Sequence, residues 1–268
     1  MPQRSSGKTP PKKSPAGKRV ARPIRPSRAA QAKAKPSISA FFPAYNEEAN
    51  IAALCLKTAA VLKRLGSSWE VIAVNDGSRD RTAAVVEALH KKEARIRVVS
   101  HAVNQGYGAA VKTGFVSARL DWIFFTDGDG QFDVNELERL VPLMADHDLV
   151  VGYRIKRADS RQRLANAWAW GTLVRTLFRL KGVRDIDCAF KIVRRSVFDT
   201  FSLETTGAMI STELLVKSQK NGFRIAEIGV GHYPRTAGVQ TGAKLKVIAR
   251  AFKELFLYFI KWQSNGYR

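Results

Sequence analysis

The stretch DWIFFTDGDGQFD, residues 121–133, joins an apolar run to an acidic loop. The run WIFFT is short and rich in aromatic and β-branched residues, which is typical of a buried strand. Three carboxylates and an amide follow within seven residues, at Asp127, Asp129, Gln131 and Asp133. The whole chain is strongly basic, with 45 Lys and Arg against 23 Asp and Glu in 268 residues, so this acidic loop needs a specific explanation.

Three similar runs precede this one along the chain. They are SISAFFP at 37–43, WEVIAVND at 69–76 and RIRVVS at 95–100. Patterns with helical spacing lie between the runs, at 47–65, 81–92 and 106–118. Strands that alternate with helices indicate right-handed crossovers, so the sequence predicts an α/β fold with a mostly parallel sheet flanked by helices.

Acids and amides gather where the predicted strands end. PAYNEE follows the first strand, NDGSRDRT the second and DGDGQFD the fourth. Each acid alone has an ordinary alternative, because Asp-Gly pairs form turns and Asp80 and Asp133 are predicted N-caps. In parallel sheets, however, ligands bind beyond the carboxyl ends of the strands. Together these residues predict one acidic edge that binds a cation.

The loop at 127–131 offers the donor atoms that a hard cation prefers. Alternate residues of an extended loop point to the same side, so Asp127, Asp129 and Gln131 can bring three oxygens together. Mg²⁺ or Mn²⁺ is the expected occupant, and phosphate oxygens in the remaining positions imply a nucleoside diphosphate. No Walker A or dinucleotide fingerprint is present, and we expect the glycines of NQGYGAAVKTG to serve close helix-to-strand packing.

The positive charge is concentrated at the N-terminus. Residues 1–36 hold eleven Lys or Arg and no acid, which predicts a disordered basic tail. Neither an apolar leader nor an uncharged apolar run long enough to span a bilayer is seen. Two distant cysteines, Cys55 and Cys188, and four isolated histidines predict no disulfide framework and no zinc site, and fit a reducing cytoplasm. Cys55 is expected in the core.

Seven motifs in series resemble those of the polyprenyl-phosphate sugar transferases of the family-2 glycosyltransferases, typified by dolichol-phosphate mannosyltransferase. They are PAYNEE, VNDGSRDRT, NQGYGAAVKTGF, TDGDGQFD, DLVVGYR, CAFKIVRR and HYPRTAG, and the match covers residues 37–240. The resemblance implies a GT-A fold. It also implies inverting transfer of a hexose from GDP-mannose or a UDP-hexose to a dolichyl or undecaprenyl phosphate at the cytoplasmic face of a membrane.

The resemblance assigns roles to individual residues. The implied nucleotide contacts are Pro43, Tyr45, Glu47, Val74, Asp76, Asp127, Gly128 and Asp129. Asp127 and Asp129 look like the family's aspartate pair, and Asp129 with Gln131 would hold the metal. Arg154 and Arg235 look like arginines that face phosphate groups, and with the aspartate pair they form the implied catalytic set.

Some positions depart from the family pattern or leave alternatives open. Gly128 stands where alanine is often found, which we expect to add flexibility, and Lys244 is the nearest match to a lysine that the family carries earlier. Arg157 and Lys191 are further phosphate candidates, or else solvated surface charges. Asp187 and Glu213 could act as a base toward a hydroxyl acceptor, or else as structural ion-pair partners.

Residues 243–262 predict an amphipathic helix. Its apolar face comprises Leu245, Ile248, Phe252, Leu255, Phe256 and Phe259, and Lys246, Arg250, Lys253 and Lys261 lie opposite. This profile favours a helix in the interface of an anionic bilayer, although packing on the sheet is the ordinary alternative. The stretch 161–180, with Trp168 and Trp170, has a similar character.

The sequence thus predicts three parts: a tail at 1–36, a GT-A domain at 37–240 and a membrane-surface helix at 241–268. A peripheral membrane enzyme is expected. Transfer to a saccharide or another hydroxyl acceptor stays open. So does a basic protein that binds nucleic acid or acidic lipid through its tail, but this alternative leaves the acids at the strand ends unexplained, and we expect no specific nucleic-acid partner.

Overall fold

The computed structural model describes residues 35–66, 68–155, 161–235 and 245–264, with the backbone alone at 161–163 and 245–250. Nearly all of the predicted tail lies outside the described residues, as do Arg157, Lys244 and the side chains of Lys246 and Arg250.

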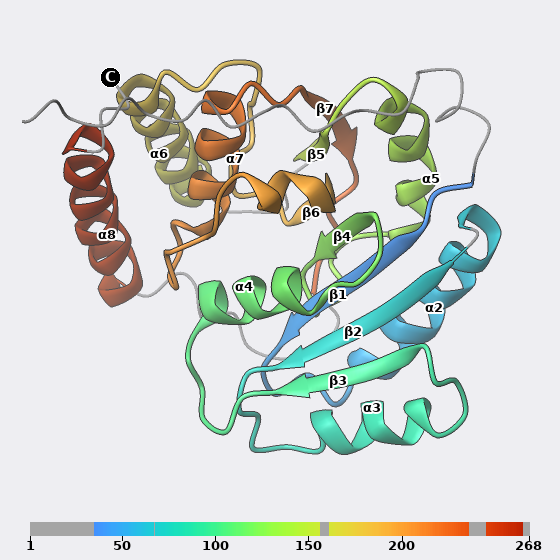
Figure 1. The fold of residues 1–268 in the computed structure, drawn as a ribbon. Helices are drawn as coiled ribbons and strands as arrows, with labels where there is room; N and C mark the ends of the chain where they lie inside the picture. Colours follow the sequence, from blue (N-terminus) through green and yellow to red (C-terminus); the bar gives the residue numbers. More distant parts are fainter. Residues whose placement is uncertain (1–34, 67, 156–160, 236–244, 265–268) are drawn as a thin grey trace, which may run out of the picture.

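A seven-stranded sheet forms the centre of the fold (Figure 1). The strands are β1 (Ile38–Ala44), β2 (Trp69–Asn75), β3 (Ile96–Ser100), β4 (Trp122–Thr126), β5 (Leu149–Arg154), β6 (Phe190–Arg194) and β7 (Ile225–Val230). Their order across the sheet is β3-β2-β1-β4-β6-β5-β7. Only β6 runs against its neighbours, since it pairs antiparallel with both β4 and β5. The predicted mostly parallel sheet is confirmed.

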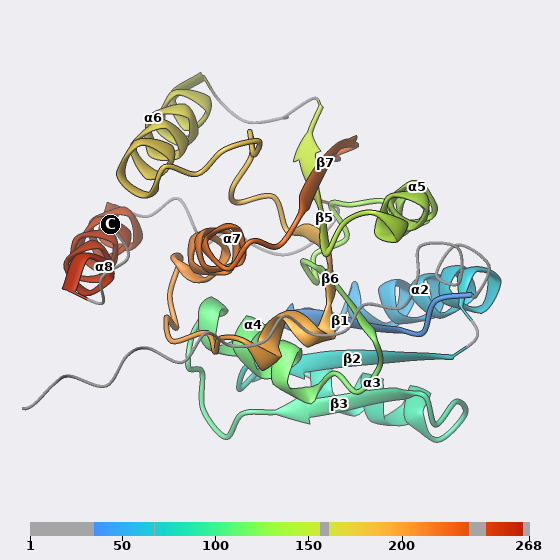
Figure 2. The same ribbon diagram turned by 45° about the horizontal axis from the view of Figure 1, so that its top comes forward.

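Helices cover both faces of this sheet. They are α2 (Ile51–Leu65), α3 (Thr82–His90), α4 (Tyr107–Ser117), α5 (Leu137–Leu140), α6 (Arg161–Phe178), α7 (Ile210–Lys220) and α8 (Leu245–Ser264). The described residues also form three 3₁₀ turns: η1 (Val134–Glu136), η2 (Val141–Ala145) and η3 (Arg195–Asp199). α2 contacts α3, whereas α4 returns from β3 to β4 and contacts α7. Figure 2 shows α6, α7 and α8 gathered on the side away from α2 and α3.

The four predicted strands and three predicted helices all occur. The main difference is the start of α2, at Ile51 instead of residue 47, because Asn46 has a positive φ of 56° and residues 48–50 form a turn. Asp133 caps η1 by accepting from the Asn135 amide, as predicted. Asp80 accepts from the Thr82 amide, but the N-cap of α3 is Arg81, so the N-cap role predicted for Asp80 is wrong. Cys55 is fully buried in the core, as predicted.

Close packing between β1 and α4 involves Gly114. A Cβ atom at Gly114 would lie 2.1 Å from the ring of Phe41, so only glycine lets the helix approach the strand this closely. The ring of Phe41 then contacts those of Phe115 and Phe125, with centroids 4.9 and 5.1 Å apart. The packing role predicted for this glycine is confirmed, and it fixes α4 against the centre of the sheet.

The predicted apolar face of α8 is divided in two. Leu255, Tyr258 and Trp262 are buried, and Phe178 of α6 packs on Tyr258, Phe259 and Trp262. Phe252 and Phe256 are 48% and 65% exposed. The expectation that Leu255 and Phe259 share the exposed face is therefore wrong, because Leu255 is buried and Phe259 packs against Phe178 of α6. No helix in the described part of the chain has the length and apolar character needed to cross a membrane.

Candidate active site

The acidic loop after β4 packs tightly against β1. A Cβ atom at Gly128 would lie 2.6 Å from the carbonyl oxygen of Pro43. This glycine therefore permits the close approach of two backbones, whereas the sequence led us to expect that it adds flexibility. The half-buried Asp129 accepts through Oδ1 from the Gln131 amide at 3.1 Å. These contacts hold Asp127 and Asp129 at the carboxyl ends of two adjacent parallel strands.

The last motif, HYPR, lies beside this loop. The Tyr233 amide donates to the Gln131 carbonyl at 2.9 Å, and Nε2 of Gln131 donates to the Tyr233 carbonyl at 2.9 Å. Arg235 follows two residues later. Its Nη2 forms an ion pair with Oε1 of Glu47, and its Nη1 lies 3.7 Å from Oδ2 of Asp129. Glu47, Asp129 and Arg235, which were predicted from three separate motifs, are thus brought together.

Asp127 is electrostatically strained. Burial, and then the neighbouring charge of Asp129, raise the pKa of Asp127 to about 7. The hydroxyl of Tyr107, which donates to Oδ1 of Asp127 at 3.0 Å, and the charges of Lys191 and Arg154 act in the opposite direction. A cation would relieve the repulsion between the two carboxylates.

The side chains of this loop fit a divalent cation by their donor chemistry. Asp127, Asp129 and Gln131 supply oxygen, the donor that Mg²⁺ and Mn²⁺ prefer. Within the described ranges, no group of three or more His, Cys, Asp or Glu side chains could hold a metal ion by itself. The oxygens of this loop would leave the remaining coordination positions of an ion to water or to a substrate.

The carboxylate of Asp76 has several internal partners. Asp76 is buried, and its carboxylate accepts from the amides of Gln105 and Gly106, at 2.8 Å each, and contacts Nδ1 of His101 at 2.7 Å. Val74 is also buried, in register with Pro43 of β1. Of the predicted nucleotide contacts near this edge, Tyr45 is the exposed one. A base or ribose contact for Asp76 stays a prediction.

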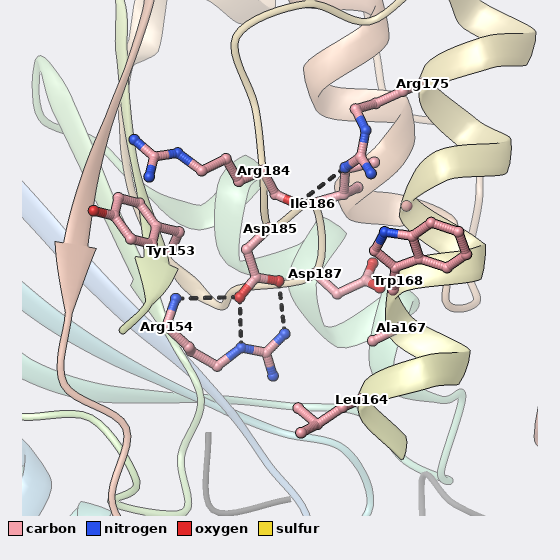
Figure 3. A pocket seen from close by; sticks show the side chains of 11 residues that line it. Tyr153, Arg154, Leu164, Ala167, Trp168, Arg175, Arg184, Asp185, Ile186 and Asp187 are labelled. Atoms are coloured by element: carbon pink, nitrogen blue, oxygen red, sulfur yellow. Dashed lines mark hydrogen bonds and ion pairs between the residues drawn. The ribbon is translucent and has the colours of Figure 1, made fainter. Parts of the chain in front are cut away.

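Arg154, at the end of β5, lines a pocket of about 260 Å³ (Figure 3). Its Nε and Nη2 donate to the two carboxylate oxygens of Asp185 at 2.7 Å each. Burial opposes the charge of Arg154, but the bonds to Asp185 outweigh it and raise the pKa of the guanidinium above its ordinary value. Two more arginines line the pocket: Arg184, which stacks on Tyr153 at 4.2 Å, and Arg175 of α6.

Apolar side chains of α6 form another wall of this pocket. Leu164, Ala167 and Trp168 line it, and Trp168 is 70% exposed. Figure 3 shows Arg154 and Asp185 on the side opposite Trp168, with Asp187 between them. The pocket therefore combines guanidinium groups with an apolar rim, and Arg154 is near enough to Asp127 to affect its pKa.

Two residues proposed from the sequence have purely internal contacts. Lys191 is fully buried on β6 and donates to the carbonyls of Ile186, at 3.1 Å, and Cys188, so it is neither a solvated charge nor a phosphate ligand at the surface. Burial lowers the pKa of Lys191. Glu213 is also fully buried and pairs with Lys217 at 2.7 Å, so its structural alternative is confirmed.

Tyr107 and Asp185 were missed by sequence reasoning. Tyr107 lies inside the glycine-rich stretch, which was assigned to packing. Asp185 precedes the CAFK motif by three residues. An unexplained pair of acids at 185 and 187 was the available signal, because acids next to a predicted phosphate-binding arginine are candidates for its partner.

The chain belongs to glycosyl transferase family 2, whose model matches residues 39–201. This confirms the family expected from the motifs. The undecaprenyl-phosphate 4-deoxy-4-formamido-L-arabinose transferase of Pseudomonas aeruginosa is 31% identical over 222 residues, which are 80% of this chain and 63% of the relative. The dolichyl-phosphate beta-glucosyltransferase of Dictyostelium discoideum is 31% identical over 72% of this chain and 65% of that protein. The chain thus spans less than two thirds of these relatives.

A solved structure supports the fold. The glucosyl-3-phosphoglycerate synthase of Mycobacterium tuberculosis, in complex with Mn²⁺ and UDP-glucose, superposes with a TM-score of 0.66 at 21% identity, over 88% of this chain and 84% of the other. The GT-A fold predicted from the sequence is confirmed by this similarity.

Proposed function

We propose that this protein transfers a monosaccharide, with inversion, from a nucleotide-diphosphate sugar to a polyprenyl phosphate at a membrane surface. The observation that carries the proposal is the position of the Arg154 pocket. Arg154 is near enough to Asp127 to affect its pKa. The pocket also carries three arginines and has an apolar rim on α6 that includes the exposed Trp168. A phosphate joined to a hydrocarbon chain matches this combination of groups.

The donor is proposed to bind at the acidic edge. Asp127, Asp129 and Gln131 would hold Mg²⁺ or Mn²⁺, and Arg235 would lie near the same diphosphate. When bound, such an ion neutralises the departing diphosphate as a Lewis acid. Tyr45, which is exposed, is proposed to contact the nucleotide. The donor base, guanine or uracil, is left to experiment.

The acceptor phosphate is proposed to bind beside Arg154. A guanidinium binds phosphate through two parallel hydrogen bonds. The carboxylate of Asp185 accepts this pair of hydrogen bonds from Arg154 in the structure. A phosphate monoester is largely dianionic at neutral pH, so it can attack without a strong general base. Asp187 lines the pocket and would be the base for a hydroxyl acceptor, the alternative that this geometry still permits.

Membrane contact is proposed for the exposed apolar residues of α6 and α8. Phe252, Phe256, Leu257 and Ile260 of α8 and Trp168 of α6 are all exposed, and α8 packs on α6. Lipid would cover these side chains and bring the acceptor to the pocket. The domain limits at 36 and 240 and the role of the tail are part of the same proposal.

The test incubates purified protein and Mn²⁺ with radiolabelled GDP-mannose or UDP-hexoses and a polyprenyl phosphate in anionic vesicles. Labelled lipid is the expected product. Label on an added saccharide, with none on lipid, would favour the hydroxyl-acceptor alternative. A chain lacking residues 1–36 should keep its turnover. If the protein showed no turnover and lost its binding to nucleic acid or acidic lipid with this deletion, a binding protein that acts through its tail would be favoured instead.

A further inference from the structure

Tyr107 makes a contact that packing does not explain. It is the first residue of α4 and is 43% exposed, yet its hydroxyl donates to Oδ1 of Asp127 at 3.0 Å. An exposed ring contributes little to the core, so the hydrogen bond is the main interaction that distinguishes tyrosine from phenylalanine at this position.

The backbone around Tyr107 is held from two sides. Asp76 accepts from the amides of the two residues before it, Gln105 and Gly106, at 2.8 Å each. On the other side, the amide of Ala109 donates to the carbonyl of Thr206 at 3.1 Å. Tyr107 therefore starts α4 from a fixed point of the backbone, from which its hydroxyl reaches Asp127.

His101 extends this support. Its Nδ1 contacts Asp76 at 2.7 Å, and its Nε2 contacts Oγ1 of Thr113, on the second turn of α4, at 2.9 Å. Asp76 thus joins the end of β2 directly to the residues that precede α4 and, through His101, to the second turn of that helix. This gives the buried carboxylate of Asp76 a structural purpose: it fixes the helix that carries Tyr107.

Asp127 needs such a restraint because the charge of Asp129 repels it. An unrestrained carboxylate would turn away from its neighbour and would have to turn back when a cation or a diphosphate binds. A hydrogen bond to one oxygen limits this rotation and leaves the other oxygen in a defined direction.

We propose that Tyr107 is a positioning residue for Asp127, which holds that carboxylate in the orientation needed by the divalent cation of the donor complex. This inference rests on the proposed function, because it takes the acidic edge as the donor site. A direct contact of the Tyr107 hydroxyl with the donor sugar is the competing role.

The first measurement is Mn²⁺ binding, by calorimetry with and without UDP or GDP, to the full chain and to Tyr107→Phe. Losing one hydrogen bond to a charged group should weaken Mn²⁺ binding about 10-fold. The melting temperature without metal should not change. Thr200→Val is the control, because it removes a hydroxyl that donates to the Val197 carbonyl at 2.8 Å in the segment after β6, and it should leave Mn²⁺ affinity unchanged.

The second measurement is a double-mutant cycle with Asp127→Asn, read as Mn²⁺ affinity. If Tyr107 acts through Asp127, adding Tyr107→Phe to Asp127→Asn should cause little further loss. Additive losses, or unchanged Mn²⁺ affinity in Tyr107→Phe, would overturn the proposal. In turnover assays, we expect Tyr107→Phe to lower kcat and leave the KM for the lipid acceptor unchanged.

The outcomes separate this inference from the proposed function. Wild-type protein that binds Mn²⁺ in a Tyr107-dependent manner but labels no lipid would refute the proposed function and support the role of Tyr107. Normal sugar transfer by the wild type, together with a Tyr107→Phe variant that binds Mn²⁺ like the wild type, would support the proposed function and refute the role of Tyr107. A loss seen only with the sugar nucleotide, and not with Mn²⁺ and the nucleoside diphosphate, would assign the hydroxyl to the sugar and overturn the positioning role.

Discussion

Asp185 accepts two parallel hydrogen bonds of 2.7 Å from the guanidinium of Arg154, and both side chains are largely buried. The carboxylate uses the same fork that a phosphate group would use. An acceptor phosphate must therefore share the Arg154 guanidinium with Asp185 or displace the Asp185 carboxylate from it. Experiments can measure whether phosphate binds to Arg154.

We predict that Asp185→Asn lowers the free energy of unfolding by about 3 kcal/mol, because it leaves a largely buried guanidinium without its counter-charge. Inorganic phosphate should restore part of the lost melting temperature by binding Arg154. Asp148→Asn is the matched control, because Asp148 lies 3.7 Å from Arg194 in another buried ion pair away from the pocket. Equal phosphate rescue of both variants would contradict a specific site at Arg154.

Asp129→Ala should abolish sugar transfer and leave the fold intact, because a loop carboxylate contributes little to the core. Activity with labelled donor and a thermal melt are the two measurements. Asp133→Ala, four residues later, removes a cap of η1 and should keep most of the activity. Full turnover of Asp129→Ala, or of wild type in excess chelator, would exclude the metal role.

The raised pKa of Asp127 predicts a pH-dependent stability of the metal-free protein. Between its ordinary value of 3.8 and about 7, the folded protein keeps a proton that the unfolded chain has lost. Stability should therefore fall as the pH rises through this window. Asp127→Asn should remove this component and be more stable than wild type at pH 8, by about 1–3 kcal/mol after allowance for solvent screening. Thermal melts in chelator at pH 5 and pH 8 test the prediction. The same change in melting temperature between the two pH values for the wild type and Asp127→Asn would contradict it.

Arg235→Lys keeps the charge but loses the planar group that spans Glu47 and Asp129. A lysine Nζ is a single point and cannot hold both carboxylates in the same way. We expect a clear fall in the transfer rate that extra donor restores only in part. Initial rates over a range of donor concentrations measure this effect. An unchanged rate would indicate that Arg235 has only a structural role.

For membrane binding, we predict that Phe252→Ser with Phe256→Ser releases the protein from anionic vesicles while its melting temperature is kept. These two rings are exposed, whereas Leu255 and Tyr258 are buried, so Tyr258→Ser is the control that should destabilise the protein instead. Binding of wild type should weaken with salt, because charges are screened over about 10 Å at 0.1 M. Co-sedimentation of the double variant at the wild-type level would refute lipid contact by α8.

The parts of the fold that could be predicted are those set by local pattern. The runs ending in Ala44, Asn75 and Thr126 are apolar and bounded by turn residues, so the parallel strands and their acidic edge followed from sequence. β6 could not be placed this way, because an antiparallel insertion between β4 and β5 depends on distant pairing. Lys191 sits on that strand, and its burial was missed for the same reason.

The site was predictable where a residue type implied a chemistry and unpredictable where contacts decided the role. Asp127 and Asp129 were found because paired acids in a basic chain are unusual. The internal bonds of Asp76, by contrast, depend on the path of residues 101–106, which no periodicity in the sequence defines. In α8, the helical pattern was correct, but only the position of Phe178 shows which apolar residues face inward.

Glu47 and Arg235 are 188 positions apart, so their contact can form only after residue 235 has been made. β3, β2, β1 and β4 all come from the first half of the chain and are neighbours in the sheet, so they can pair while later strands are still being made. A nascent chain at that stage already carries Glu47 and Asp129 but no Arg235. The Glu47–Arg235–Asp129 cluster is therefore assembled only after the segment that follows β7 has been made.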